Sequence, residues 1–391
     1  MYDFDKVIDR RGTCSVKYDS LKEVFGTEDL LPMWVADMDF QAPPSVLEAV
    51  RDTAHRGVFG YTFRSAESVD SFIDWVGTRY DWKIRREWVT SAPGIVAALP
   101  IAIRAFTSEG DKILIQTPVY PPFHAIVKEN SRQLVCSPLF IENGTWCIDW
   151  DNFENRLKEG IKMFILCSSH NPLGRVWSRE ELKRMGELCC KYGTIIFSDE
   201  IHADLSLYGN RHTVMASVSD EIAANTITAM APSKTFNIAG MLNSVIISSS
   251  ERLLKGYNGE LTKMHLDLGN IFGHISMAAA YRGNEEWLRA LISYLEKNID
   301  FAYDFVGREL SGVTFIKPQS SFLLWLDFRN SGYSHQEVKE RLLNVSKLGL
   351  NDGLAFGPEG EGFFRMNLGT PLSRVREGME RLKLGFSFAA L

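Results

Sequence analysis

The most constraining feature of the sequence is a pair of short apolar runs with a helix-like segment between them. Residues 163–167 are Met-Phe-Ile-Leu-Cys, and residues 195–197 are Ile-Ile-Phe, directly before Ser198 and Asp199. Short runs that are apolar at every position are typical of strands buried on both faces of a parallel sheet. The segment 178–192 lies between them with a helical pattern and completes a β-α-β unit. The sequence therefore predicts an α/β fold with a mostly parallel sheet.

The same pattern places two ionisable side chains at strand ends. Asp199 ends one buried strand, and the run 225–230 leads into a segment of small residues that contains Lys234. Open α/β sheets bind ligands at the carboxyl ends of their strands. A desolvated lysine has a lowered pKa and a nucleophilic neutral amine, which suits Schiff-base chemistry with a carbonyl. From this segment alone, a surface lysine in a polar loop is an open alternative.

Composition limits the classes of protein and partner. A length of 391 residues exceeds one compact core and favours two domains, and 45% hydrophobic with 24% charged residues is ordinary for a globular protein. A net charge of −6 gives no reason to expect nucleic acid or an anionic membrane as partner. With no apolar signal core or membrane-length run, we expect a cytoplasmic protein. The six cysteines lack C-x-x-C or metal-ligand spacing, so we expect reduced thiols and no metal site.

Several other segments have clear local patterns. Closely spaced prolines and the exposed-looking acids Asp37 and Asp39 favour an extended segment over residues 31–44. Ser45 after two prolines predicts a helix N-cap, and Pro93-Gly94 predicts a helix start whose free N–H groups suit a phosphate. In the second half we expect helices at 285–310 and 372–386, and strands at 312–328 and 362–369.

Arg365 is the one cation inside the last of these apolar strand patterns. A cation there is costly without a partner, and a planar guanidinium binds a carboxylate through two hydrogen bonds. Arg365 is therefore a candidate for binding a substrate carboxylate. A structural salt bridge is the alternative.

The order Asn171, Asp199, Ser233-Lys234 resembles that of fold type I pyridoxal phosphate (PLP) enzymes, in the aminotransferase class I/II superfamily. Segments 33–40, 199–202 and 233–240 are similar, more narrowly, to its C–S lyase branch, the MalY/PatB-like cystathionine β-lyases. The resemblance implies a large PLP-binding domain with a mostly parallel sheet (46–284) and a smaller α+β domain (285–391). Residues 1–45 would form an N-terminal strap and part of the small domain.

The resemblance also implies roles for individual residues. Lys234 would hold PLP and act as the base, Asp199 would pair with the pyridine nitrogen, and Tyr120 would stack on the ring and carry protons. The phenolic oxygen would be held by Asn171. Phosphate contacts would come from Gly94, Ile95, Val96 and Ser233, with Tyr61 reaching the partner subunit's site in a homodimer. Arg365, Trp34 and Ala36 would contact a small amino-acid substrate. A packed core tyrosine (Tyr120), an exposed loop tyrosine (Tyr61) and a domain-connecting strap are the structural alternatives.

Three departures from the aminotransferase pattern affect the expected reaction. His202 replaces the usual tyrosine at the phenolic oxygen, while Ala231 and Leu242 replace a phosphate-binding serine and arginine. Since the C–S lyase branch commonly shows these changes, the resemblance implies α,β-elimination from L-cystathionine or a related cysteine S-conjugate, giving pyruvate, ammonia and a thiol. An aminotransferase on the same fold and a PLP-binding regulatory protein are the alternatives.

Overall fold

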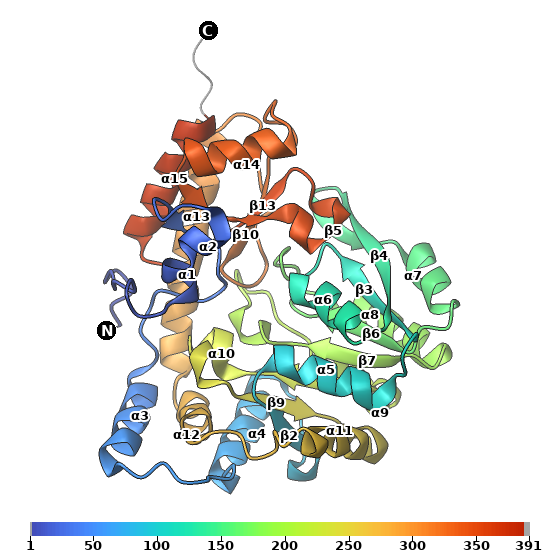
Figure 1. The fold of residues 1–391 in the computed structure, drawn as a ribbon. Helices are drawn as coiled ribbons and strands as arrows, with labels where there is room; N and C mark the ends of the chain where they lie inside the picture. The colour runs from blue at the N-terminus through green and yellow to red at the C-terminus, as the bar shows by residue number, and fades with distance from the viewer. Residues whose placement is uncertain (1, 387–391) are drawn as a thin grey trace.

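The computed structural model describes residues 2–386, and a large mixed sheet forms its centre (Figure 1). The eight strands described lie in the order β2-β9-β8-β7-β6-β3-β4-β5, in which β8 to β4 run parallel. β9 is antiparallel to both of its neighbours, and β5 is antiparallel to β4. The strands are β2 (Val89–Ala92), β3 (Lys112–Thr117), β4 (Gln133–Glu142), β5 (Thr145–Ile148), β6 (Met163–Cys167), β7 (Ile195–Asp199), β8 (Thr226–Met230) and β9 (Ser244–Ile247).

Alternating side chains of these strands enter two separate hydrophobic cores. Ile113 and Ile115 of β3 pack in one core, whereas Leu114 between them packs in the other. The first core also contains side chains of α5 (Ile95–Phe106), α6 (Pro121–Glu129) and α11 (Glu251–Lys263). The second contains side chains of α7 (Trp150–Leu157), α8 (Arg179–Lys191) and α9 (Asp220–Ala224). Because helices cover both faces, the central strands β3, β6, β7 and β8 are buried at nearly every position.

A second, smaller sheet is built from the C-terminal part of the chain, and a separate strand pair joins an N-terminal segment to this part. Its order is β10-β13-β12, all antiparallel, and a separate pair β1-β11 runs parallel. The long helix α13 extends from the α12 region to α14 and α15, beside this sheet (Figure 1). The strands are β1 (Leu31–Pro32), β10 (Leu323–Asp327), β11 (Leu348–Gly349), β12 (Asn351–Asp352) and β13 (Phe363–Asn367).

The remaining helices connect these two parts. The α-helices are α1 (Val16–Asp19), α2 (Leu21–Phe25), α3 (Pro44–Arg56), α4 (Ala66–Tyr80), α10 (Pro232–Thr235), α12 (Ile271–Ala280), α13 (Glu285–Glu309), α14 (His335–Asn344) and α15 (Leu372–Phe386). Six 3-10 helices lie within the described residues: η1 (Arg86–Trp88), η2 (Ala203–Leu205), η3 (Met215–Ser217), η4 (Ala239–Met241), η5 (Gly353–Phe356) and η6 (Pro358–Gly360). None of the helices in residues 2–386 is both long and apolar enough to cross a membrane.

The predicted α/β fold is confirmed, with three local corrections. Ser45 is not an N-cap, because α3 already begins at Pro44 and the Ser45 hydroxyl instead lies 3.1 Å from Asn284 Oδ1. The strand predicted over 312–328 is regular only at Leu323–Asp327, since the preceding residues form only two isolated bridges, Thr314 with Asp327 and Ser320 with Ser206. Asp39 is buried rather than exposed and forms an ion pair with Lys17. The domain boundaries at residues 45 and 284 stay a prediction.

Candidate active site

Three neighbouring strands of the large sheet end at the same place. Cys167 of β6 pairs with Asp199 of β7, which pairs in turn with Ala229 of β8. Asn171 follows the first of these strands closely, and Lys234 follows the last, on α10. The parallel register therefore brings Asn171, Asp199 and Lys234 to one edge of the sheet, as the sequence predicts.

Lys234 is held in an environment that favours its neutral amine. Burial, and after it the positive charge of Arg365, lower the Lys234 pKa to about 8, against the opposite effects of Asp37 and Asp199. Its Nζ donates a hydrogen bond to the carbonyl oxygen of Ala36. A much larger fraction of this amine than of an ordinary lysine is thus unprotonated near neutral pH, which is the form that attacks a carbonyl.

Asp199 is a buried carboxylate without a cationic partner among residues 2–386. Its side chain accepts a hydrogen bond from the backbone N–H of Ile201 at 3.1 Å. Burial raises the Asp199 pKa to about 7, although the Ile201 N–H and the charge of Lys234 act in the opposite direction. Such a carboxylate would be stabilised as an anion by any cationic ring nitrogen brought beside it.

Arg365 is a buried cation with neutral partners only. The guanidinium donates to Asn171 Oδ1 at 3.0 Å, Asn351 Oδ1 at 2.7 Å and the carbonyl oxygen of Trp34 at 3.0 Å. No carboxylate of the described residues lies within ion-pair distance, and burial lowers the Arg365 pKa to about 10. With the side chain only 4% exposed, the missing anion leaves a place for a substrate carboxylate.

Tyr120 and His202 lie within electrostatic reach of these groups. Burial raises the pKa of Tyr120, which also responds to the charges of Arg365 and Asp199, so its hydroxyl keeps its proton at neutral pH. Burial, and after it the positive charges of Lys234 and Arg365, lower the His202 pKa to about 3. The neutral His202 ring is 3% exposed, and its Nδ1 has no hydrogen-bond partner in the described chain.

The N-terminus of α5 provides the predicted anion-binding turn. Gly94 is its N-cap at φ 129°, a conformation that side chains disfavour, and the helix begins at Ile95. The first N–H groups of a helix have no partner within it, so those at Ile95 and Val96 are available to a phosphate. Ser233 contributes a further hydroxyl on α10, whereas Leu242 is 57% exposed and offers no polar group.

Comparison with known proteins agrees with this arrangement. Residues 28–382 match the family described as aminotransferase class I and II. The chain belongs to the aminotransferase class I and II family. The predicted family is thereby confirmed, including its C–S lyase branch. The chain is 43% identical to cystathionine β-lyase PatB of Bacillus subtilis, over 98% of this chain and 100% of that protein. It is 31% identical to protein MalY of Escherichia coli, over 98% of each.

Solved structures of this family show the same fold. Cystalysin from Treponema denticola, a structure that contains a pyridoxal 5′-phosphate cofactor, superposes with a TM-score of 0.95 at 32% identity, covering 98% of each chain. The PLP-bound C–S lyase from Staphylococcus hominis gives a TM-score of 0.90 at 32% identity, covering 99% of this chain and 98% of that one. The fold type predicted from the sequence is thus confirmed.

Of the residues predicted for the site, Trp34 and Ala36 contact it through their main chain, and Tyr61 lies away from it. Trp34 and Ala36 face Arg365 and Lys234 with their carbonyl oxygens. Tyr61 is fully exposed on the loop between α3 and α4 and does not join the other residues within one chain. Its predicted role therefore depends on a second subunit.

Sequence reasoning missed Asn351 and Asn367. Asn351 lies on the short strand β12, and no spacing or motif marks it. Asn367 lies two residues after Arg365 on β13, which places both side chains on the same face of the strand. That spacing is the signal by which Asn367 was detectable.

Proposed function

We propose that the chain is a PLP-dependent C–S β-lyase. Its substrate would be L-cystathionine or a related cysteine S-conjugate, cleaved by α,β-elimination to pyruvate, ammonia and a thiol. The observation that carries this proposal is the convergence of a buried amine, a buried carboxylate and a buried guanidinium without an anion: Lys234, Asp199 and Arg365. The similar protein PatB is named as a cystathionine β-lyase.

The residues of the site fit the cofactor. Asp199 has no cation of its own within residues 2–386, and the Nδ2 atom of Asn171 donates to no group there, although its Oδ1 accepts from Arg365. Asp199 would therefore hold the ring nitrogen and Asn171 the phenolic oxygen. Gly94, Ile95, Val96 and Ser233 would hold the phosphate. His202 would lie beside the phenolic oxygen, and Tyr120 beside the ring. Bound PLP supplies a covalent attachment for the substrate amine and an electron sink for the negative charge that develops at Cα.

The chain's own residues divide the remaining work. The guanidinium of Arg365 binds the substrate carboxylate and fixes the Cα–H bond relative to Lys234. The Nζ of Lys234 accepts the Cα proton, which its lowered pKa permits near neutral pH. When the Cβ–S bond breaks, the electron pair leaves with sulfur, and the Tyr120 hydroxyl can supply the proton that the thiolate takes. Water completes the balance, since cystathionine and water give homocysteine, pyruvate and ammonia.

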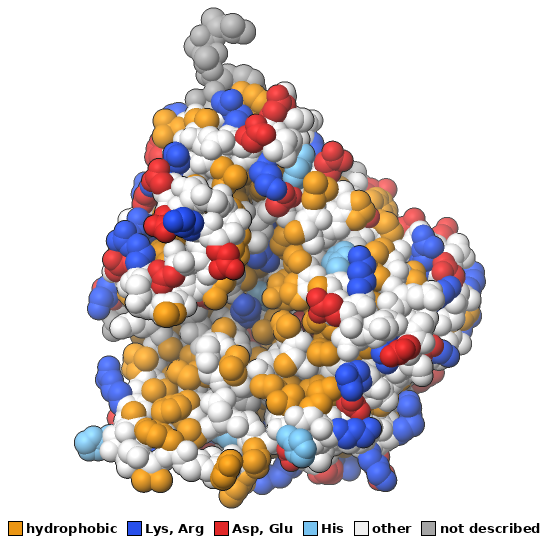
Figure 2. Space-filling view, viewed as in Figure 1, with side chains coloured by type: hydrophobic (Ala, Val, Ile, Leu, Met, Phe, Trp, Pro, Cys, Tyr) orange, Lys and Arg blue, Asp and Glu red, His pale blue; other side chains and the backbone are white. Residues whose placement is uncertain are grey.

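We propose a homodimer in which Tyr61 completes the phosphate site of the partner subunit. Support comes from the exposed loop around it, where Val58 and Phe63 are each 76% exposed and Phe59 is 57% exposed. Hydrophobic side chains gather on the lower part of the face shown in Figure 2, below a hollow that contains Lys or Arg side chains. Exposed apolar groups of this density are typical of a surface covered in an oligomer. A cytoplasmic location and the three-part division at residues 45 and 284 are proposed on the sequence alone.

The deciding experiment supplies L-cystathionine without any keto acid and measures pyruvate, ammonia and free thiol together. Equal amounts of the three products from the purified chain, and none from Lys234→Ala, are expected. Turnover that required a keto-acid acceptor and released no pyruvate would replace the lyase by an aminotransferase. Bound PLP without either reaction would leave the regulatory-protein alternative.

A further inference from the structure

The carbonyl oxygens of residues 34–37 alternate between two sets of hydrogen-bond donors. The carbonyl of Trp34 accepts a hydrogen bond from Arg365 at 3.0 Å, and the carbonyl of Ala36 accepts one from Lys234. These two hydrogen bonds place both acceptors toward the candidate site. One short piece of main chain thus contacts the two cations of the site.

Asn367 contacts the same segment through the other carbonyls. Its Nδ2 donates to the carbonyl oxygens of Val35 at 2.5 Å and Asp37 at 2.6 Å, while its Oδ1 accepts from the N–H of Gly369 at 2.7 Å. The side chain is 1% exposed, so these bonds are shielded from water. The Asn367 amide therefore uses both of its N–H donors to hold the segment, through the carbonyls that do not contact Arg365 or Lys234.

A buried ionic cluster holds the end of this segment. Arg10 donates to Asp37 at 2.7 Å and to Asp39 at 2.9 Å, and Lys17, only 1% exposed, donates to Asp39 at 2.8 Å. The indole N–H of Trp34 donates to the carbonyl of Lys17 at 3.0 Å. Residues 10 and 17 thus hold the segment through side chains, independently of Asn367.

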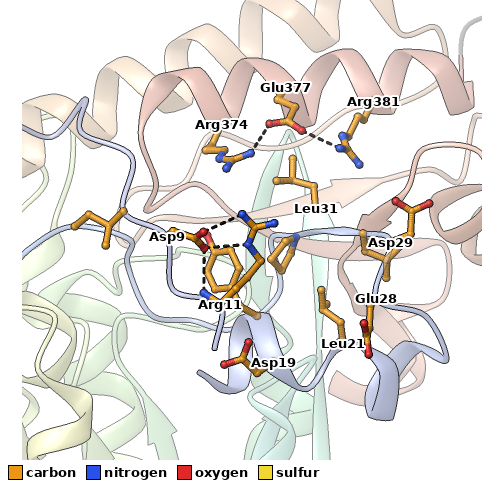
Figure 3. A pocket seen from close by; sticks show the side chains of 14 residues that line it. Asp9, Arg11, Asp19, Leu21, Glu28, Asp29, Leu31, Arg374, Glu377 and Arg381 are labelled. Atoms are coloured by element: carbon orange, nitrogen blue, oxygen red, sulfur yellow. Dashed lines mark hydrogen bonds and ion pairs between the residues drawn. The ribbon is translucent and has the colours of Figure 1, made fainter. Parts of the chain in front are cut away.

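The outer side of residues 8–32 leaves a polar cavity of about 550 Å³ against α15 (Figure 3). Glu377 pairs with Arg374 and Arg381 across one wall, and Arg11 pairs with Asp9 on the other. Each guanidinium group of the cavity therefore already has a carboxylate partner, so this cavity makes no case for a ligand. The position of the segment is instead defined by inner contacts: those of Arg10, Lys17 and the Asn367 side chain with the segment and with Asp39. Hydrogen bonds of Asn237 to Met38 and Phe40, and backbone hydrogen bonds at Met33 and Asp39, hold the residues on either side.

We propose that Asn367 is a positioning residue, which holds the main chain at 34–37 so that its carbonyls orient the Arg365 guanidinium and the Lys234 amine. Asn367 touches neither cation and acts through Trp34 and Ala36. The proposal deepens the proposed function and rests on it for the role of Arg365, but the contact with Lys234 is independent of the reaction.

The test removes the two donors in Asn367→Ala and keeps one in Asn367→Ser. In the full chain freed of cofactor, labelling of Lys234 by an amine-reactive reagent is followed against pH by peptide mass spectrometry. Losing the Ala36 acceptor disfavours the protonated amine, so the labelling midpoint should fall by about half a pH unit or more in Asn367→Ala and by less in Asn367→Ser. In the loaded enzyme the KM for the amino-acid substrate should rise by about three- to tenfold, with PLP retained.

Asn284→Ala is the matched control. Asn284 is 5% exposed, and its amide donates to the carbonyls of Ala279 at 2.7 Å and Ala280 at 3.0 Å, away from the segment and the site. This variant should lose comparable stability while keeping the labelling midpoint and KM. An unchanged midpoint in Asn367→Ala, or unfolding of both Asn367 variants while Asn284→Ala stays folded, would overturn the positioning role. A wild-type chain without lyase activity would refute the proposed function, and the labelling result would still decide the Lys234 contact.

Discussion

Replacement of Arg365 by methionine tests the substrate-binding proposal most directly. The side chain keeps a similar length and apolar stem but loses the guanidinium, whose charge has no counter-ion among the described residues. A bidentate pair with a carboxylate contains two charge-assisted hydrogen bonds of about 1.5–3 kcal/mol each. Their loss should raise the free energy of the transition state, relative to free enzyme and substrate, by about 3–6 kcal/mol. This corresponds to a fall in kcat/KM of roughly 10²–10⁴-fold.

Folding stability should respond far less than activity to this change. Removing an uncompensated buried charge is favourable, whereas Asn171, Asn351 and Trp34 each lose a donor for one oxygen. Because the two effects oppose each other, we expect the free energy of unfolding to change by less than about 2 kcal/mol. The Lys234 pKa should rise in the cofactor-free variant, since a nearby positive charge is removed.

The assay combines steady-state kinetics, PLP content and urea denaturation. Arg365→Lys serves as the matched variant, because it keeps the charge but not the planar pair of donors, and should fall between the wild type and Arg365→Met. A large loss of stability or of bound PLP in Arg365→Met, with kcat/KM per loaded site little changed, would make Arg365 a structural residue and refute the reasoning.

Four further outcomes are expected. Lys234→Ala should stay folded by circular dichroism but lose the PLP that borohydride fixes to the chain, and fixation on another lysine would exclude this role. In the cofactor-free chain, PLP capture should accelerate as pH rises through about 8, where Lys234 loses its proton. A capture rate that stays the same between pH 7 and pH 9 would contradict this. Because burial raises the Asp199 pKa from 3.8 to about 7, the cofactor-free fold binds more protons than the unfolded chain between those values. The contribution of Asp199 to stability should therefore fall as pH rises across that range, so the difference in unfolding free energy between the wild type and Asp199→Asn should decrease with rising pH in urea titrations, and a constant difference would contradict the shift. Tyr61→Phe should weaken PLP retention by about 0.5–1.5 kcal/mol in a chain that sediments as a dimer, and a fully active monomer would refute the shared site.

The parts of the fold that local pattern dictates were predictable from the sequence. β6 has the predicted bounds, Met163–Cys167, and α8 begins after Ser178 with a capping box to Glu181. Gly94 is the helix N-cap as expected. In each case neighbouring residues determine the structure, so no knowledge of distant contacts is required.

The contacts that complete the site depend on residues far apart in the chain. Asp39 is predicted to be exposed because acidic side chains usually are. No residue near it in the sequence indicates that the Lys17 Nζ lies 2.8 Å from its carboxylate. Asn351 meets Arg365 only because β12 pairs with β13.

The pairing between Trp34 and Arg365 has a consequence for synthesis of the protein. The two residues are 331 positions apart, so the ribosome must add the whole large sheet before the guanidinium can reach its place. At about 5–20 residues per second, that interval lasts roughly 15–65 seconds. In the last part of this interval, once residue 234 has been added, the nascent chain carries Lys234 and Asp199 but lacks the last strand, β13. The order of translation therefore supplies the amine and the carboxylate before Arg365 is present.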